Sequence, residues 1–115
     1  MSDPTKWLRR SGVEIAAAIR RGETTSRAVV EAHIARIERV NPVINALVRD
    51  RFEQARDEAD EADRRLREAG AGALPPFHGV PCTVKECFAM TGMPQTSGLV
   101  SRRDVVADHD APTVT

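Results

Sequence analysis

The sequence of 115 residues predicts an α/β chain with three helices, two short strands and a long loop. Apolar residues recur at helical spacing in three segments, at about 12–21, 26–40 and 51–69. Two short runs, Val43–Val48 and Cys82–Lys85, are rich in β-branched residues and typical of strands. From Ala89 to Asp110, turn residues predominate and no helical period is present, so this stretch is expected to be a functional or mobile loop.

The first two helices have recognisable start and stop signals. Ser11 followed by Glu14 reads as a capping box that opens the first helix, and Gly22 is a natural stop for it. Residues 24–26 (Thr-Thr-Ser) offer N-caps for the second helix. The dipeptide at 41–42 (Asn-Pro) is expected to end the second helix, since the residue before a proline disfavours the helical conformation.

The third helix has the clearest period in the sequence. Its apolar stripe consists of Phe52, Ala55, Ala59, Ala62, Leu66 and Ala69. Asp50 with Glu53 can cap its start, and Gly70 its end. Acid-first pairs at i,i+4 are expected at Asp60–Arg64, Glu61–Arg65 and Asp63–Arg67. Because the stripe is mostly alanine and covers under three heptads, it favours a solvated helix lying on its own domain over a coiled-coil partner helix.

Composition and charge exclude several classes of protein. Hydrophobic residues make up 41% and charged residues 30% of the chain, a balance typical of a soluble globular protein. Seventeen basic residues face seventeen acidic ones, which argues against a non-specific nucleic-acid binder. No apolar run approaches the ~18 residues that a membrane span needs, and the N-terminus has no secretory pattern. The expectation is a cytoplasmic soluble protein, or a piece of one, without a nucleic-acid partner.

The two cysteines, Cys82 and Cys87, are too few for a disulfide framework, and no further ligands complete a zinc site around them. They are interpreted as small buried thiols in a reducing compartment. A nucleophilic cysteine activated by the intervening Lys85 is the alternative. The histidines, none with a partner at metal spacing, are His33, His78 and His109. No nucleotide-binding glycine loop is present either, so neither a cofactor nor a metal is expected.

Lys85 is the strongest candidate for a chemical role. Fifteen of the 17 basic residues are arginine, and the only lysines are Lys6 and Lys85. Arginine cannot give up its proton at working pH, whereas lysine can when burial disfavours its charged form. A single lysine at the end of a β-like run therefore suggests a position that needs a titratable amine. The alternative is a solvated lysine at a strand end.

Several segments together resemble the N-terminal part of the amidase signature family. The downstream segments are residues 77–86 (FHGVPCTVKE), 91–94 (TGMP) and 96–98 (TSG). The upstream segments, similar to the family's opening helices and first strand, are residues 30–38 (VEAHIARIE), 40–42 (VNP) and 45–46 (NA). The resemblance runs from about residue 11 to residue 115, and Lys85-Glu86-Cys87-Phe88 looks more like general and fatty-acid-amide amidases than the amidotransferase subunit that works on charged tRNA.

The resemblance implies an α/β/α fold around a mixed sheet and a serine hydrolase of carboxylic amides with a Ser–cis-Ser–Lys triad. Lys85 stands at the position of the catalytic lysine. In the implied mechanism, neutral Lys85 accepts a proton through the bridging cis-serine, so that the nucleophilic serine can attack the amide carbonyl. The implied partner is a small-molecule amide substrate, with no membrane segment and no cofactor. A homo-oligomer or a complementing chain is possible.

Both family serines belong to a Gly/Ser-rich stretch that nothing in these residues matches. Residues 1–115 are therefore interpreted as the N-terminal portion of an amidase domain, with the lysine motif in a strand–loop segment at 77–110, and as inactive alone. Two alternatives stay open. One is a truncated, non-catalytic helical interaction module. The other is a subunit of a split amidase or amidotransferase that completes its active site with a partner chain.

Overall fold

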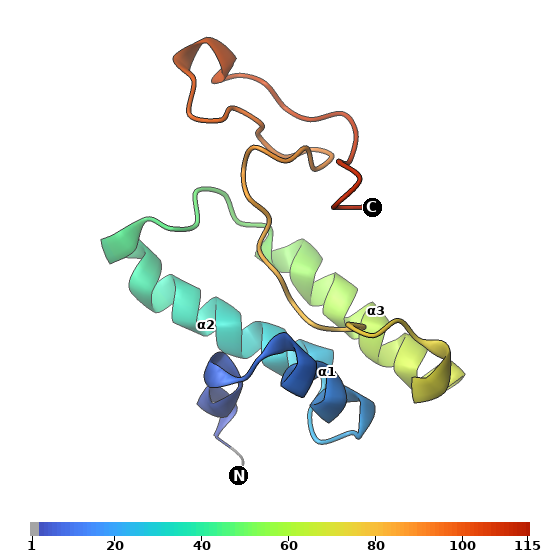
Figure 1. The fold of residues 1–115 in the computed structure, drawn as a ribbon. Helices are drawn as coiled ribbons and strands as arrows, with labels where there is room; N and C mark the ends of the chain where they lie inside the picture. Colours follow the sequence, from blue (N-terminus) through green and yellow to red (C-terminus); the bar gives the residue numbers. More distant parts are fainter. Residues whose placement is uncertain (1–2) are drawn as a thin grey trace. The chain divides into compact units, whose positions relative to one another are not determined.

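The computed structural model describes residues 3–115. Its elements in chain order are η1 (Pro4–Arg9), α1 (Gly12–Arg20), α2 (Ser26–Ile44), α3 (Phe52–Ala69), η2 (Ala71–Ala73) and η3 (Val100–Arg102) (Figure 1). The chain divides into two compact units. The first comprises Met1–Ala46 with Arg51–Pro81, and the second comprises Leu47–Asp50 with Cys82–Thr115. All three α-helices belong to the first unit, whereas Lys85 belongs to the second.

The start of α1 confirms the predicted capping box. The Ser11 amide donates to the Glu14 carboxylate at 2.8 Å, and the Glu14 amide donates to the Ser11 hydroxyl at 3.3 Å. Two N–H groups at the helix start are thus satisfied reciprocally. The helix ends at Arg20, and Gly22 follows with a φ of +70°, a conformation that glycine adopts without steric cost.

The second helix starts as predicted but runs further than predicted. The Thr25 hydroxyl accepts a hydrogen bond from the Ala28 amide at 3.0 Å, as an N-cap does. The prediction that α2 ends near residue 40 is wrong, because the helix continues through Pro42 to Ile44. Proline lacks an N–H, but its fixed φ is helical, so one lost hydrogen bond near the end does not stop the helix. Asn45, with a φ of +46°, ends it.

The third helix runs from Phe52 to Ala69, and Gly70 ends it as predicted. The predicted cap from Asp50 with Glu53 is wrong: the N-cap residue is Arg51, and no side chain caps this end. Arg51 instead donates two hydrogen bonds along the helix to the Glu58 carboxylate, at 2.8 and 3.1 Å.

Helices α2 and α3 pack antiparallel, since Ser26 contacts Asp63, whereas Glu31, further along α2, contacts Arg56, which lies earlier in α3. Two groups of side chains form the core of this unit. The first consists of Trp7, Ile15, Ala18, Ile19 and Val29, with Leu66 and Val80 packed against it. The second consists of Val30, Ile34 and Ala59, with Phe52 and Ala55 packed against it. Four members of the predicted apolar stripe of α3, Phe52, Ala55, Ala59 and Leu66, therefore pack on their own unit, whereas Ala69 is exposed.

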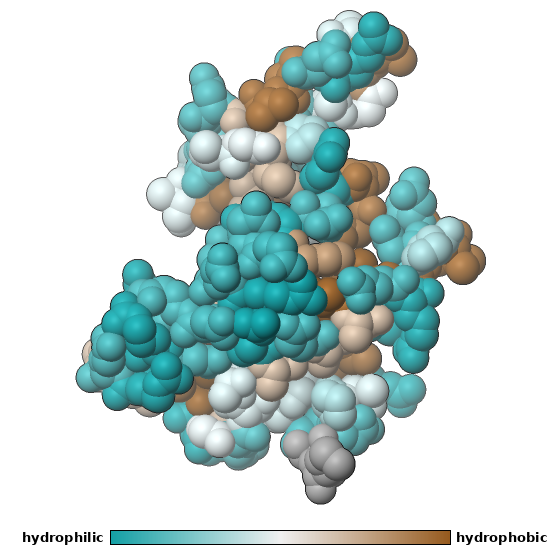
Figure 2. All heavy atoms as spheres, turned by 180° about the vertical axis from the view of Figure 1, so that it is seen from behind, coloured by the Kyte–Doolittle hydropathy of each residue, from teal (hydrophilic) through white to brown (hydrophobic). Residues whose placement is uncertain are grey.

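Many large apolar side chains lie outside this core. They are Val13, Val43, Ile44, Val48, Phe77, Val84, Phe88, Leu99, Val100 and Val106, each exposed by 39% or more. Figure 2 shows such hydrophobic atoms on the surface between hydrophilic regions. Transfer of apolar surface out of water stabilises a protein by about 25 cal/mol per Å², and these side chains gain only part of that term.

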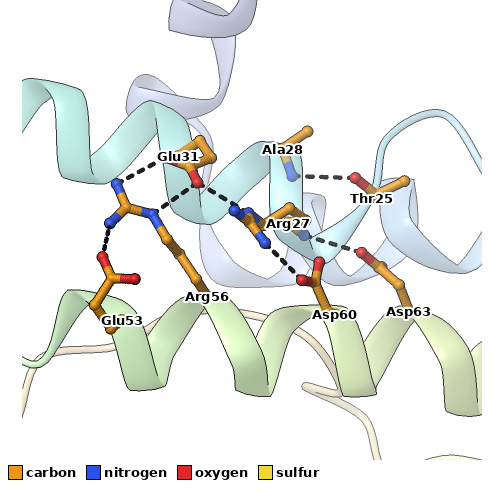
Figure 3. A network of polar contacts seen from close by, with 8 residues as sticks. All are labelled: Thr25, Arg27, Ala28, Glu31, Glu53, Arg56, Asp60 and Asp63. Atoms are coloured by element: carbon orange, nitrogen blue, oxygen red, sulfur yellow. Dashed lines mark hydrogen bonds and ion pairs between the residues drawn. The ribbon is translucent and has the colours of Figure 1, made fainter.

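A buried carboxylate joins α3 to the start of α2. The Ser26 amide donates to Asp63 Oδ1 at 2.7 Å. The Arg27 amide donates to Asp63 Oδ2 at 3.0 Å (Figure 3). The first N–H groups of a helix have no partner within it, so Asp63 satisfies two of them and Thr25 a third. The negative carboxylate also lies at the positive end of the helix dipole.

The neighbouring ion pairs differ from those predicted. Only the pair Glu61–Arg65 forms, at 2.8 Å. Asp60 pairs with Arg27 of α2, and Asp63 accepts the two amides described above. The side chain of Arg64 turns to two glutamates of its own helix, Glu61 and Glu68. Contacts to α2 thus take precedence over two of the three pairs within α3.

The two predicted strands do not form within the described residues. Residues 43–44 belong to the last turn of α2, so the strand predicted at Val43–Val48 is wrong. Residues 82–85 have no regular structure, since a strand needs a neighbour with which to pair. An isolated β-bridge joins Pro94 to Val106 in antiparallel sense. As described, residues 3–115 are mainly helical, and the α/β prediction is supported only in its helices.

Candidate active site

The chain leading to Lys85 is fastened to the helices of the first unit. The Ser26 hydroxyl donates to the Gly79 carbonyl oxygen at 2.6 Å. His78 Nε2 lies 2.8 Å from the Ala62 carbonyl oxygen, which assigns this histidine to loop attachment. Gly79 has a φ of +79°, and a Cβ there would lie 3.1 Å from Ser26 Cβ. Glycine is required here by both the backbone conformation and the close approach.

Lys85 lies in the second unit, directly before a turn. Its side chain is exposed. Its carbonyl oxygen accepts a hydrogen bond from the Phe88 amide at 2.9 Å, which closes the turn over residues 85–88. The fixed part of Lys85 is therefore its backbone, and its amine extends from an ordered turn.

Glu86, next to Lys85, accepts three hydrogen bonds from one distant turn. The Thr96 amide and hydroxyl donate to Oε1 at 2.6 and 2.8 Å, and the Ser97 amide donates to Oε2 at 2.8 Å. The bond from the Thr96 amide, followed by that from its hydroxyl, holds the pKa of the Glu86 carboxyl below its ordinary value. Glu86 is thus a charged anchor for residues 96–97.

A second contact fastens the same two segments. Gln95 Nε2 donates to the Cys87 carbonyl oxygen at 3.1 Å, and Arg102 donates to the Gln95 carbonyl oxygen at 3.1 Å. Ser97 has a φ of +52°, in the left-handed region that few residues other than glycine adopt. Such a backbone conformation persists where surrounding contacts hold it, and here the hydrogen bonds to Glu86 hold Ser97 in it.

The remainder of the predicted loop is ordered by backbone pairing. The Gly92 amide donates to the Ala107 carbonyl oxygen at 2.9 Å, and the Ala107 amide donates to that of Met93 at 3.0 Å. Ala89 and Ala107 are buried. Asp110 Oδ1 accepts the Thr91 amide at 2.7 Å and hydroxyl at 2.9 Å. This stretch without α-helices is therefore held by backbone hydrogen bonds around one β-bridge and by two carboxylates.

The other residues weighed from the sequence have different positions. Cys82 and Cys87 are both exposed, so the interpretation as buried thiols is wrong. Burial of a thiol needs neighbouring side chains packed around it, and the other described residues do not cover this segment. His33 contacts the Val29 carbonyl oxygen within its own helix, and His109 lies beside Asp108. Within residues 3–115, no group of three or more possible metal ligands is gathered.

Sequence reasoning missed the roles of Glu86 and Asp63. Glu86 is part of the motif around Lys85, but its partners lie ten and eleven residues further along the chain. Asp63 was assigned to an ion pair within α3, whereas its partners lie 37 and 36 residues earlier. A usable signal for Glu86 was the Thr-Ser-Gly turn at 96–98, whose amides need acceptors.

Comparison with known families defines the class of this protein. Residues 28–115, which include Lys85 and Glu86, match the family model described as Amidase. The chain belongs to the amidase family, as the sequence motifs predicted.

Three relatives illustrate what the chain is similar to. It is 49% identical over 109 residues to fatty-acid amide hydrolase 2-A of Danio rerio, covering 90% of this chain and 20% of that protein. It is 41% identical over 104 residues to indoleacetamide hydrolase of Bradyrhizobium diazoefficiens, with the same coverage of 90% and 20%. It is 39% identical over 108 residues to an acylamidase of Rhodococcus erythropolis, covering 94% and 22%. The chain thus spans about a fifth of the length of these relatives. Within residues 3–115, no helix is both long and apolar enough to cross a membrane.

Proposed function

We propose that the protein carrying this chain hydrolyses small-molecule carboxylic amides, and that Lys85 is its general base. The observation that carries the proposal is the position of Lys85 in the amidase-matched region, as one of only two lysines in the chain. Relatives of this region include proteins named for hydrolysis of fatty-acid amides and of indoleacetamide. The α/β/α architecture implied by the resemblance is part of the same proposal.

The proposed reaction is acyl transfer through a serine. Neutral Lys85 accepts a proton through a bridging cis-serine, and the nucleophilic serine then bonds to the amide carbonyl carbon. Backbone amides stabilise the negative oxygen of the tetrahedral intermediate. The proton moves to the leaving nitrogen as the C–N bond breaks, and water then hydrolyses the acyl–serine ester. No residue of this sequence matches the two serines, so they would come from outside these residues.

The structure supports the proposal through the environment of Lys85. A general base must be reachable by the groups with which it exchanges protons. The Lys85 side chain is exposed, and its backbone lies in a turn closed by the Phe88 amide. The attachment point of the amine is therefore ordered, as a group that transfers protons at a defined site needs to be. A neutral amine at working pH also requires burial of this side chain, and the described residues do not bury it.

The test is amide hydrolysis by the Lys85→Arg and Lys85→Ala variants of the protein that carries this chain. Arginine keeps the positive charge but cannot act as a base, so both variants should lose hydrolysis at least about a hundredfold while staying folded. Lys6→Arg is the matched control, since Lys6 is the other lysine and lies over the Trp7 ring, 4.4 Å from its centroid. It should keep full activity.

A double variant tests the thiol alternative in the same assay. Cys82→Ser with Cys87→Ser should retain activity, because the chemistry is assigned to a serine and a lysine. Substantial hydrolysis by Lys85→Arg would contradict the assignment of Lys85. A folded but inactive cysteine variant, together with inactivation of the parent protein by iodoacetamide, would favour the thiol mechanism.

A further inference from the structure

We propose that Glu86 is a positioning residue for Lys85. Its hydrogen bonds to the turn at residues 96–97, called the clamp below, fix the backbone position of the neighbouring Lys85. The inference rests on the proposed function and adds a role for a residue that takes no part in the proposed proton transfer. It starts from three hydrogen bonds to the carboxylate of Glu86, the residue that follows Lys85 in the chain.

The clamp uses both oxygens of the carboxylate. Two donors of Thr96 share Oε1, and the Ser97 amide takes Oε2, all between 2.6 and 2.8 Å. Hydrogen bonds to a charged acceptor are about twice as strong as neutral ones. Thr96 extends the clamp, since its hydroxyl oxygen also accepts the Gly98 amide at 3.2 Å. Three consecutive residues thus depend on Glu86, directly or through one hydroxyl.

The clamp reaches Lys85 through the backbone. Glu86 is the second residue of the turn that the Phe88 amide closes onto the Lys85 carbonyl oxygen. The third residue of that turn, Cys87, accepts the Gln95 side-chain amide. Two neighbouring residues of the lysine turn are therefore fastened to residues 95–97. A reactive group displaced by about 1 Å can lose about a hundredfold in rate, so this fastening has a kinetic consequence.

Glutamine cannot replace the carboxylate. A glutamine side chain offers one acceptor oxygen, and its NH₂ group would meet either the Ser97 amide or the Thr96 donors. One N–H would then face another donor, and a donor left unsatisfied is costly. Glu86→Gln should therefore loosen the clamp, and Glu86→Ala should remove it.

The experiment measures kcat and KM of the two variants in the protein that carries this chain, together with amide hydrogen exchange at residues 96–98. We expect kcat to fall about tenfold for Glu86→Gln and about a hundredfold for Glu86→Ala, with KM changed less than about twofold. Exchange at Thr96 and Ser97 should accelerate. The matched control is Asp110→Asn, because Asp110 also accepts a backbone amide and a threonine hydroxyl in the same unit. It should leave kcat unchanged.

Milder variants keep the test decisive if Glu86→Ala fails to fold. Thr96→Val removes one of the three hydrogen bonds and should lower kcat several-fold, whereas Thr96→Ser keeps the hydroxyl and should restore it. If the Glu86 and Thr96 variants lose thermal stability but folded enzyme keeps its kcat, Glu86 is only structural and the inference is overturned. Lys85→Arg would still be inactive in that case. An active Lys85→Arg enzyme would instead overturn the proposed function, and the inference with it.

Discussion

Three carboxylates hold backbone amides that are distant in the chain. Asp63 binds the start of α2, Glu86 binds the turn at 96–97, and Asp110 binds Thr91. Each accepts at least two hydrogen bonds, and Asp63 is buried as well. An unsatisfied N–H that is removed from water costs more than an ordinary hydrogen bond contributes, so these side chains are expected to be sensitive positions.

Removal of the Asp63 carboxylate should destabilise the helical unit. Asp63→Ala leaves the Ser26 and Arg27 amides without their acceptor. At about 1–3 kcal/mol for each unsatisfied group, we expect the free energy of unfolding to fall by roughly 3 kcal/mol. Urea titration followed by far-UV circular dichroism measures this change. Exposed Asp57 on the same helix provides the control, and Asp57→Ala should change the free energy by less than about 0.5 kcal/mol. Equal effects of the two variants would contradict the role of Asp63.

At the scale of elements, the pair α2–α3 combines an apolar stripe with a polar border. Glu31 of α2 accepts hydrogen bonds from Arg27 of its own helix at 2.9 Å and from Arg56 of α3 at 2.8 Å. Arg56 also pairs with Glu53 (Figure 3). Exposed ion pairs contribute little singly, but one glutamate shared by two arginines links the helices in a defined register.

The pH dependence of the helix pair should report on Glu31. Hydrogen bonds from Arg56 first, and then from Arg27, lower the pKa of the Glu31 carboxyl from its ordinary value. Its contribution is therefore fully present above the ordinary pKa of glutamate and is lost as the pH falls through the lowered folded value. Unfolding measured across the acid range should show that Glu31→Gln is less stable than the parent near neutrality and that the difference shrinks in acid. Glu38→Gln, an exposed position on α2, should show no such trend. A constant difference for Glu31→Gln would contradict this linkage.

At the scale of the whole molecule, much apolar surface has no cover among the described residues. The most exposed examples are Val43 at 86% and Val100 at 79%, one in each compact unit. Among residues 3–115, in contrast, only two large side chains of the core are fully buried, Ile19 and Val29. Exposed apolar surface of this kind marks interaction sites or a tendency to aggregate.

The 115-residue chain by itself should therefore bind a hydrophobic dye and self-associate while keeping its helical far-UV signal. Dye fluorescence and sedimentation velocity at micromolar concentration measure these properties. Val43→Thr combined with Val100→Thr should reduce dye binding, since each change adds a hydroxyl with little change of shape. We also expect no amide hydrolysis by the chain alone. A clean monomer with a sharp cooperative melt and no dye binding would refute this expectation.

The sequence alone determined the features that depend on residues close together in the chain. The starts of α1 and α2 follow from Ser11 with Glu14 and from Thr25, because a cap contacts amides only two or three residues away. The apolar stripe of α3 follows from its period, and the amidase family follows from the motif around Lys85.

Only the tertiary structure decided which distant groups meet. Asp63 had a suitable arginine four residues away, but the buried amides of α2 bind it instead, because unsatisfied N–H groups cost more than an exposed ion pair contributes. The run at residues 82–85 has β-prone residues, yet a strand exists only where another strand supplies its hydrogen bonds. Glu86 acquires its role in the same way, since the turn that it clamps is ten residues away and is brought to it by folding.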